Sequence, residues 1–368
     1  MAPIRVAQVV GKMAGGGVEQ VVMNYYCHID RSRVQFDFIV DSDSTLVPHE
    51  EIESLGGRIF EVPPYQRVLA YQRALARLFR ERRWPIVHSH VNALSVFPLR
   101  AAKRAGVPVR IAHSHSTAGK GEPAKNAVKC ILRRLSNVYP THRMACSRYA
   151  GEWLFGKGAE FEVVYNAIDL SRFAFDAEAR ARARADLGLV GGQFAVGHVG
   201  RFMPQKNHRF LIEAFAELAR LRPDAVLLLV GSGEAEAVVE GWAAERGVAD
   251  KVLSLGQRDD VDRLYQAFDV FALPSLYEGL PLVSVEAQAA GLPCFLSDRI
   301  TREVDVTGAV RFLPIDDPSA WATAFSEVTP GARVDVCRGD FADYDIECAA
   351  KRLAARYLGL AEEVRFGW

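Results

Sequence analysis

The sequence contains few cysteines and none in a metal-binding pattern. Six cysteines are scattered through 368 residues, with no Cys-x-x-Cys pair and no Cys/His cluster at zinc spacing. A disulfide framework and a structural zinc site are therefore not expected. We expect reduced, mostly buried thiols in a cytoplasmic protein, because free thiols persist in reducing compartments.

Long apolar runs are also missing. No uninterrupted apolar stretch reaches the roughly 18 residues that a membrane-spanning helix needs. The opening segment MAPIRVAQVVGKMAGGG lacks the apolar core of a signal peptide, because Lys12 and three glycines follow one short apolar run. We expect a soluble cytoplasmic protein, and contact with the inner membrane face stays open.

The chain has no net charge, but its two halves do. Residues 1–170 carry 23 lysines and arginines against 15 aspartates and glutamates, an excess of eight positive charges. Residues 171–368 carry 22 against 30, an excess of eight negative charges. Either the basic half meets an anionic surface or ligand, or the two halves attract each other.

Several signatures of catalysis and nucleic-acid binding are absent. The sequence has no P-loop, no H-E-x-x-H and no G-x-S-x-G. The stretch KGEPAKNAVKCILRRLSN places Lys125, Lys129 and Arg133 four residues apart, with apolar residues between them. A solvated helix face and a contact with an anionic membrane both fit this pattern. Nucleic acid fits less well, because no aromatic residues are interleaved with the charges.

Strand-like and helix-like segments alternate along the chain, which predicts α/β architecture with parallel sheets covered by helices. A turn-rich stretch at 162–176 interrupts the pattern, which then starts again. We expect two α/β domains of similar length, 1–170 and 171–345, followed by a C-terminal helix within 346–368. The expected strands are 4–10, 36–40, 58–62, 85–91, 107–113, 194–202, 225–233, 251–257 and 270–274.

Two strand-to-helix loops are rich in glycine. Such loops lie at the edge of an open sheet where ligands bind. In GKMAGGGVEQ, three glycines allow the backbone to approach a ligand closely, although a tight turn explains them as well. The loop does not form a dinucleotide-binding fingerprint. In LVGSGEAE, Gly231 and Gly233 flank Ser232, and we favour a turn there.

Two further loops carry charge. In GRFMPQKN, Arg201 follows a strand and Lys206 stands at the start of a helix, which suits a diphosphate. Solvated side chains are the simpler explanation for either residue alone. In PSLYEGLPLVSVEAQAAGLP, Glu278 stands at the sheet edge and Glu286 lies in the following helix, whose first turn suits Pro281. Carboxylates there can accept hydrogen bonds from sugar or ribose hydroxyls, although Glu286 also fits an ordinary helix surface.

Two His-Ser-His copies end predicted strands, as His88/His90 and His113/His115. Residues two apart on a strand point to the same face. A metal site is disfavoured, because no cysteine or acidic residue accompanies them at ligand spacing. We expect a hydrogen-bonding or acid/base role in a cleft.

Together these segments resemble glycosyltransferase family 4, the retaining transferases with the GT-B fold. The matching stretches include GGGVE, NAIDLSRF, VGHVGRFMPQKNHRFLIEAF, LLLVGSGE, LGQRDDV and FALPSLYEGLPLVSVEAQAAGLP, and they cover most of the chain. The stretch VHSHVNALSVFPLRAAKRAGVPVRIAHSHSTAGKGE looks like the capsular and exopolysaccharide branch. The resemblance implies two Rossmann-like domains facing each other across a cleft, with the C-terminal helix as a candidate for crossing back to the N-terminal domain.

The resemblance also implies site roles. Arg201 and Lys206 match the pair that neutralises the leaving diphosphate, Glu278 the acid near the sugar hydroxyls and Glu286 the acid on the ribose. His113 is assigned as the histidine near the sugar O6, with His115 as the alternative. Pro281 is a departure, because it has no N–H to offer a phosphate. The positions assigned to the donor are Gly16, Gly17, Arg201, Lys206, Gly256, Arg258, Gly279, Leu280, Leu282, Val283 and Glu286.

The implied activity is retaining transfer of a hexose or N-acetylhexosamine from a nucleotide sugar, with UDP as the favoured nucleotide. No metal or other cofactor is expected, because arginine, lysine and helix N–H groups supply the positive charge. The donor domain is the C-terminal one and the acceptor domain the N-terminal one, with a glycan on a lipid diphosphate as the favoured acceptor and no nucleic acid. The alternatives are a nucleotide-sugar epimerase with the same fold and a catalytically silent sugar-nucleotide-binding subunit.

Overall fold

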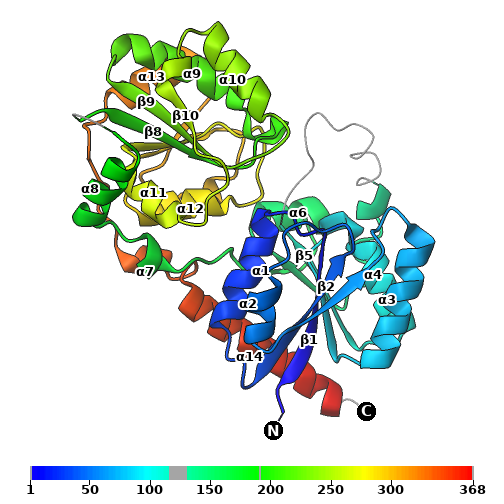
Figure 1. Ribbon diagram of the computed structural model, residues 1–368. Helices are drawn as coiled ribbons and strands as arrows, with labels where there is room; N and C mark the ends of the chain where they lie inside the picture. The colour runs from blue at the N-terminus through cyan, green and yellow to red at the C-terminus, as the bar shows by residue number, and fades with distance from the viewer. Residues whose placement is uncertain (1, 116–130, 190–191, 367–368) are drawn as a thin grey trace. The chain divides into compact units, whose positions relative to one another are not determined.

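A computed structural model of the chain describes residues 2–115, 131–189 and 192–366, with side chains up to residue 364. The chain divides into two compact units (Figure 1). The N-terminal unit comprises Met1–Ile168 and Asp343–Trp368, and the C-terminal unit comprises Asp169–Ala342. None of the helices described reaches the length and apolar character that crossing a membrane demands.

The N-terminal unit is built on a seven-stranded parallel sheet with the order β3-β2-β1-β4-β5-β6-β7. The expected strands at 4–10 and 58–62 match within one residue, because each is a short run of apolar and β-branched residues bounded by glycine or proline. The strands are β1 (Ile4–Gly11), β2 (Val34–Asp41), β3 (Arg58–Val62), β4 (Ile86–Ser89), β5 (Val109–Ser114), β6 (His142–Ala145) and β7 (Glu162–Val163).

Helices cover both faces of this sheet. One face packs on α3 and α4 through a core that includes Val9, Leu75, Val87 and Leu99. The opposite face carries Gln8 and lies beneath α1 and α14, which contact each other. The helices are α1 (Gly17–His28), α2 (His49–Ser54), α3 (Val68–Arg82), η1 (Asn92–Ser95), α4 (Val96–Arg104), α6 (Arg148–Phe155) and α14 (Ile346–Phe366).

The C-terminal helix α14 belongs to the N-terminal unit, so the expected crossing back is confirmed. A parallel bridge joins the two chain segments near the return. The amide of Ile168 donates to the carbonyl of Tyr344 at 2.8 Å, and the amide of Ile346 donates to the carbonyl of Ile168 at 3.0 Å. This contact brings the side chains of α14 onto the face of the sheet that carries Gln8.

The C-terminal unit contains a six-stranded parallel sheet with the order β10-β9-β8-β11-β12-β13. Its central strands β8, β9 and β11 are buried along their whole length, as expected for a sheet covered on both faces. The strands are β8 (Phe194–Val199), β9 (Ala225–Val230), β10 (Val252–Ser254), β11 (Val270–Leu273), β12 (Cys294–Ser297) and β13 (Arg311–Leu313).

The helices of this unit pack on the sheet through one large core, in which α9 contacts α13 and α10. The helix α9 begins immediately after a loop that holds charged residues, and α12 begins after another. The helices are α7 (Leu170–Phe173), α8 (Ala177–Asp186), η2 (Pro204–Lys206), α9 (His208–Leu221), α10 (Glu236–Glu245), η3 (Ala249–Lys251), α11 (Val261–Ala267), α12 (Leu282–Ala289), η4 (Arg302–Val304), α13 (Pro318–Ser326) and η5 (Arg338–Phe341).

The thiols are less buried than expected: Cys146 and Cys294 are buried, Cys27 is partly buried, and Cys337 and Cys348 are exposed. The exposed pair lies in the segment that leads back to the N-terminal unit and at the start of α14, where no core covers it. The basic helix face that included Lys125 and Lys129 lies outside the described residues, apart from its end at residues 131–137.

Candidate functional site

The charged and glycine-rich loops of the C-terminal unit follow neighbouring strands. Because β10, β9, β8 and β11 are adjacent and parallel, the loops after them lie at one edge of the sheet. The strand order reverses between β8 and β11, and a reversal of this kind opens a crevice at the carboxyl ends of the strands. The loop after β8 carries Arg201 and Lys206, and the loop after β11 carries Glu278.

An ion pair joins these two loops. The Nζ of Lys206 lies 2.7 Å from Oε1 of Glu278, and the two side chains are only 13% and 11% exposed. The amide of Gln205 donates to the other carboxylate oxygen at 2.9 Å and to the carbonyl of Tyr277 at 2.9 Å. Both oxygens of Glu278 are therefore held, and the carboxylate stays at the switch point of the sheet.

Backbone contacts fix the same two loops. The amide of Leu276 donates to the carbonyl of Gln205 at 2.8 Å. Asn207 takes the left-handed conformation, with φ of 56°, and its side-chain amide donates to the carbonyl of Pro274 at 3.3 Å. Asparagine tolerates this conformation better than most residues. The loops after β8 and β11 therefore form one structure that positions Lys206.

Arg201 differs from Lys206 in its surroundings. Its side chain is exposed at the start of the same loop, and it forms no ion pair or side-chain hydrogen bond with any residue that the structure describes. An exposed guanidinium at this edge can turn toward an anion and donate two parallel hydrogen bonds. The structure thus places one fixed and one exposed cation after β8.

The loop after β9 packs against the loop after β8. A Cβ on Gly231, whose φ is +136°, would lie 2.2 Å from the carbonyl oxygen of Gly200. A Cβ on Gly233 would lie 2.5 Å from the carbonyl oxygen of Phe202. These two glycines are therefore required by the close approach of two backbones, which explains the Gly-Ser-Gly turn without a ligand.

Glu286 is buried in α12 beneath the same edge. The hydroxyl of Tyr265 donates to its Oε2 at 2.9 Å. Burial raises the pKa of Glu286 to about 7, while the hydrogen bond from Tyr265 and the charge of Arg172 act in the opposite direction. Glu286 is therefore not an ordinary helix-surface acid. It is a carboxyl group poised to change protonation near neutral pH.

Most of the other positions predicted to contact the donor lie at the N-terminus of α12. Pro281 precedes α12 rather than opening its first turn, so its missing N–H removes no donor from the helix. Leu282 and Val283 are the first two helical residues, where backbone N–H groups have no acceptor within the helix. Gly279 and Leu280 are buried just before them.

The loop after β10 completes the edge. The carbonyl of Gly256 accepts from the amide of Gly231 at 2.8 Å, which ties this loop to the one after β9. Arg258 is 40% exposed and pairs with Asp260 at 2.7 Å. The structure thus gathers the predicted donor positions of the C-terminal unit around the ends of four adjacent strands and the start of α12.

In the N-terminal unit, the glycine loop after β1 is closed by an acid. One carboxylate oxygen of Glu19 accepts from the backbone amides of Ala14 and Gly16, at 3.0 and 2.8 Å. Glu19 stands at the third position of α1, so this is the acidic half of a capping box. Gly17 begins the helix, and a side chain there would meet open space.

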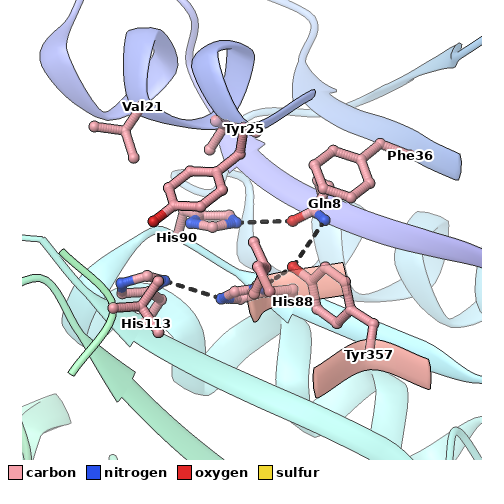
Figure 2. A pocket seen from close by; sticks show the side chains of 11 residues that line it. Gln8, Val21, Tyr25, Phe36, His88, His90, His113 and Tyr357 are labelled. Atoms are coloured by element: carbon pink, nitrogen blue, oxygen red, sulfur yellow. Dashed lines mark hydrogen bonds between the residues drawn. The ribbon is translucent and has the colours of Figure 1, made fainter. Parts of the chain in front are cut away.

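The four histidines of the two His-Ser-His copies are buried within the N-terminal unit. His88, His90 and His113 are buried on the sheet face beneath α1 and α14, around a cavity of about 10 Å³ (Figure 2). His115 is also buried, with its ring stacked on that of His113. The β4 and β5 strands are neighbours, so the two His-Ser-His copies meet. Tyr357 of α14 and the β1 side chain of Gln8 complete the cluster (Figure 2).

Six side chains of this cluster are connected by hydrogen bonds. His88 contacts Tyr357 through Nδ1 at 2.6 Å and His113 through Nε2 at 3.0 Å. His90 contacts Gln8 through Nε2 at 2.8 Å and His115 through Nδ1 at 2.9 Å. The Nε2 of Gln8 donates to the hydroxyl of Tyr357 at 3.2 Å.

Burial keeps these imidazoles neutral. It lowers the pKa of His88, His90 and His113 well below the usual value, and neighbouring histidines lower it further. The pKa of His115 falls to about 4 for the same reason. Ligand atoms of the first three lie within 4.8 Å of one another, close enough to share a metal ion. Such an ion would have to break the hydrogen bonds already made.

Four residues of these sites were not predicted from the sequence. Gln205 and Tyr265 hold the two glutamates, and they lie 73 and 21 residues from their partners. Tyr357 is 269 residues from His88. Gln8 was detectable, because a polar residue in an otherwise apolar strand predicts a specific partner in the core.

Two family models match the chain. "Glycosyl transferase 4-like domain" matches residues 16–167 and "Glycosyl transferases group 1" matches residues 179–309. EpsF of Bacillus subtilis (strain 168), which is named as a glycosyltransferase, is 39% identical over 340 residues, covering 89% of this chain and 88% of EpsF. A UDP-Gal:alpha-D-GlcNAc-diphosphoundecaprenol alpha-1,3-galactosyltransferase of Escherichia coli is 30% identical over 239 residues, 61% of this chain and 60% of that one.

Solved structures agree on the fold. HepE of Anabaena, solved in complex with UDP-glucose, matches with a TM-score of 0.74 and 18% identity, over 98% of each chain. WaaG, a glycosyltransferase involved in lipopolysaccharide biosynthesis, matches with a TM-score of 0.71 and 16% identity, again over 98% of each chain. With two Rossmann-like units, two matching family models and a relative that is 39% identical over 89% of this chain, the chain belongs to glycosyltransferase family 4 and has the GT-B fold.

Proposed function

We propose that this glycosyltransferase moves a hexose or N-acetylhexosamine from a UDP-sugar to an acceptor hydroxyl in surface-polysaccharide assembly. We further propose that configuration at the sugar is retained and that no metal is needed. The C-terminal unit binds the donor, and the N-terminal unit binds a glycan acceptor carried on a lipid diphosphate. The protein acts in the cytoplasm, at the inner face of the membrane.

The observation that carries the proposal is the pairing of Lys206 with Glu278 at the switch point between β8 and β11. The lysine and the exposed Arg201 place two positive charges where a diphosphate leaves. The N–H groups of Leu282 and Val283, at the N-terminus of α12, add a third source of positive potential. This arrangement supplies the charge that a metal ion would otherwise provide.

The two glutamates suit the two ends of one donor. Glu278 is held at the sheet edge, where its carboxylate can accept hydrogen bonds from hydroxyls of the transferred sugar. Glu286 lies in α12 and suits the ribose. The names of relatives support the same chemistry: HepE was solved with UDP-glucose, and the Escherichia coli relative uses UDP-Gal and a diphosphoundecaprenol acceptor.

The proposal is tested by thermal-shift binding of UDP, GDP, ADP and their sugars, each with and without EDTA. A ligand that binds only the folded chain raises stability by RT ln(1 + [L]/Kd). We expect a shift with UDP and one or more UDP-sugars that EDTA leaves unchanged. No shift with any nucleotide would contradict the donor site, and a shift abolished by EDTA and restored by Mg²⁺ would contradict metal independence.

Two other functions share this binding result and need product analysis. A nucleotide-sugar epimerase would release an isomeric sugar without any acceptor. A silent sugar-nucleotide-binding subunit would bind UDP and transfer nothing to any acceptor. We expect transfer to a lipid-diphosphate glycan and release of UDP, with the anomeric configuration of the donor kept in the product.

Membrane contact is supported by a group of exposed apolar residues in the N-terminal unit. Ile131, Leu135 and Val138 are 63%, 40% and 50% exposed, and Arg133 and Arg134 lie among them. Apolar and basic residues together favour the surface of an anionic bilayer. Liposome flotation should show binding to anionic vesicles that high salt weakens. Equal recovery with neutral vesicles would contradict this part of the proposal.

A further inference from the structure

A cavity of about 320 Å³ lies within the C-terminal unit, and none of the positions assigned to the donor lines it. It is bounded by α7, by the C-terminal end of α12 and by the segment 333–341 that follows α13. Its walls are mostly apolar and include Leu170, Phe175, Val336 and Phe341. Cavities of this size and character are typical of small-molecule sites.

Two arginines line this cavity, and no acidic residue of the described chain does. Arg338 is exposed, and Arg333 is partly buried. The guanidinium of Arg333 lies over the ring of Phe175, 4.3 Å from its centroid, and that ring is itself 41% exposed. An apolar cavity whose charged lining groups are both cationic favours a ligand with an apolar body and a negative charge.

Arg333 forms no ion pair with any residue that the structure describes. Its terminal nitrogens donate to the backbone carbonyls of Ala332, Gln266 and Phe268, at 3.0, 3.1 and 3.2 Å. Its Nε is buried and has no hydrogen-bond partner. A buried charge is normally paired with an opposite charge or fully hydrogen-bonded. The charge of Arg333 is therefore compensated by carbonyl dipoles alone, and incompletely.

Asp269 is the acid whose charge acts on Arg333, but both of its oxygens have other partners. Oδ1 accepts from Arg180 at 2.7 Å and Oδ2 from Arg184 at 3.3 Å, and each oxygen also accepts from a backbone amide. Three arginines therefore share one carboxylate. Burial and the charges of Arg180 and Arg184 lower the pKa of Arg333 to about 10, against the effect of Asp269.

The backbone holds Arg333 in this position. On one side the amide of Gly331 donates to Oδ1 of Asp269 at 2.7 Å, and on the other the amide of Val334 donates to the carbonyl of Gly291 at 2.7 Å. Gly291, just beyond α12, has φ of +68°, and a Cβ there would lie 3.0 Å from the carbonyl oxygen of Val334. A cation fixed in this way loses little freedom when it meets an anion.

We propose that this cavity binds an amphipathic anion, an apolar chain that ends in a carboxylate or a phosphate. The chain lies against the apolar walls and covers the exposed ring of Phe175. The head group lies beside the guanidinium of Arg333, and Arg338 adds positive potential at the same wall. The bound anion thus supplies a second negative charge to a group of arginines that otherwise share Asp269. The site is separate from the donor positions and does not depend on the proposed function.

The test is isothermal titration calorimetry of the full chain with decanoate and with decyl phosphate, each below its micelle concentration. We expect saturable binding of one molecule per chain, and the anion that binds more tightly identifies the preferred head group. Decanol has the chain without the charge, and it should bind at least about tenfold more weakly, because a hydrogen bond to a charged group is lost. Acetate and inorganic phosphate have the charge without the chain, and they should bind more weakly still, because they bury no apolar surface.

Arg333→Met removes the charge and keeps an unbranched side chain, so decanoate should bind at least about tenfold more weakly to this variant. Arg222→Met is the matched control. Arg222 also lies over a phenylalanine, 4.1 Å from the ring centroid of Phe194, and donates to a backbone carbonyl. Unlike Arg333, it pairs with Asp224 and does not line the cavity. Its loss should leave the affinity for decanoate close to that of the wild type.

A second variant tests the cavity without touching Arg333. Ala174 lines the cavity at an exposed position, so Ala174→Trp should fill it with an indole and abolish decanoate binding. The proposal would be overturned by wild-type affinity in either variant, by equal binding of decanoate and decanol, or by no saturable binding of either anion. Tighter binding of a capped apolar tetrapeptide than of decanoate would also overturn it, because the cavity would then be a contact for a protein. Absence of a thermal shift with UDP would contradict the proposed function and not this site.

Discussion

Glu278 and Lys206 form the residue pair on which the proposed chemistry most depends. Each is nearly buried, so neither charge is well solvated without the other, and Gln205 holds the second carboxylate oxygen. A buried pair of this kind does little for stability compared with an apolar pair, and breaking it leaves an uncompensated charge. Its value to the protein is better explained by a ligand that meets both charges.

Lys206→Ala should lower kcat by about 10²-fold, the usual effect of removing one preorganised charge from a transition state. Donor KM should change less, because Arg201 remains. Arg209→Ala is the matched control, since Arg209 is a cation of α9 whose side chain is 67% exposed and 3.6 Å from Glu213. Steady-state kinetics of both variants measure these changes in kcat and donor KM. A Lys206→Ala enzyme as active as the Arg209→Ala enzyme would contradict the diphosphate assignment.

Glu286 should make stability depend on pH in an unusual direction. Burial raises its pKa from 4.5 to about 7, so between these values the folded chain holds a proton that the unfolded chain has released. Stability from this group is therefore lost as pH rises through that window. From pH 5 to pH 7.5 the loss is about 2 kcal/mol, at 1.36 kcal/mol per pKa unit.

Glu286→Gln should remove this loss, because an amide keeps the shape and does not titrate. Urea unfolding at pH 5 and pH 7.5 should show the variant gaining about 2 kcal/mol relative to wild type as pH rises. Glu240→Gln, at an exposed position of α10, controls for the loss of one carboxyl group. Parallel pH profiles for Glu286→Gln and wild type would show that Glu286 is ionised throughout.

Residue types and spacings predicted which side chains gather at the carboxyl edge of the C-terminal sheet, but not how they are held. Arg201, Lys206 and Glu278 follow buried strands, and parallel strands bring such positions together. Whether Glu286 faced solvent or the core depended on the rotation of α12, which its largely apolar sequence leaves undefined. The hydroxyl of Tyr265 that meets it comes from a different helix.

At the scale of elements, the loops after β8 and β9 act as one unit. Two glycines allow their backbones to approach, and the amide of Phe202 donates to the carbonyl of Ser232 at 3.0 Å. The loop after β8 carries Arg201 and Lys206, so its position depends on a neighbouring loop that holds no charged group of the proposed site. The packing of two loops thus sets the geometry of the cations.

Gly231→Ala should therefore displace the loop after β8 and abolish the thermal shift with UDP. The new Cβ would lie 2.2 Å from a backbone oxygen, and φ of +136° is strained for alanine. Gly241→Ala is the control: Gly241 lies in α10 with nothing near its Cβ position, and alanine should stabilise the helix by about 0.5–1 kcal/mol. A normal UDP shift in folded Gly231→Ala protein would contradict this coupling.

Element boundaries were predictable where glycine or proline bounds an apolar run. The strand β3 has the predicted bounds, because Gly57 precedes it and Pro63 follows it. The strand expected at 251–257 is shorter, since its second half turns toward Gly231 and pairs through Gly256. The helix α14 lies within its predicted range of 346–368, and nothing in its own sequence identifies the sheet that it covers.

At the scale of the whole molecule, buried neutral histidines are distributed unequally. The N-terminal unit holds four in its cluster, and the C-terminal unit holds His198 and His208. Burial lowers the pKa of all six, so the unfolded chain binds more protons below about pH 6.5. Each contributes stability that is present above this pH and is lost as pH falls, up to about 2 kcal/mol at pH 5.

Two buried acids oppose this trend, one in each unit. Burial raises the pKa of Asp41 to about 6 and that of Glu286 to about 7, so both favour the folded state as pH falls. In the C-terminal unit, one such acid offsets two histidines. In the N-terminal unit, Asp41, whose pKa is raised less than that of Glu286, opposes four histidines. The N-terminal unit should therefore be the more acid-sensitive.

Hydrogen exchange followed by mass spectrometry, corrected for intrinsic exchange rates, can compare the units at pH 5 and pH 7. Peptides from β1, β4 and β5 should lose more protection on acidification than peptides from β8, β9 and β11, because four rings must be protonated when the first set unfolds. The difference should shrink when the histidine cluster is reduced by His90→Phe. Equal loss in both sets of strands would mean that the four histidines bind protons while the chain is folded. The conclusion that burial keeps them neutral would then be wrong.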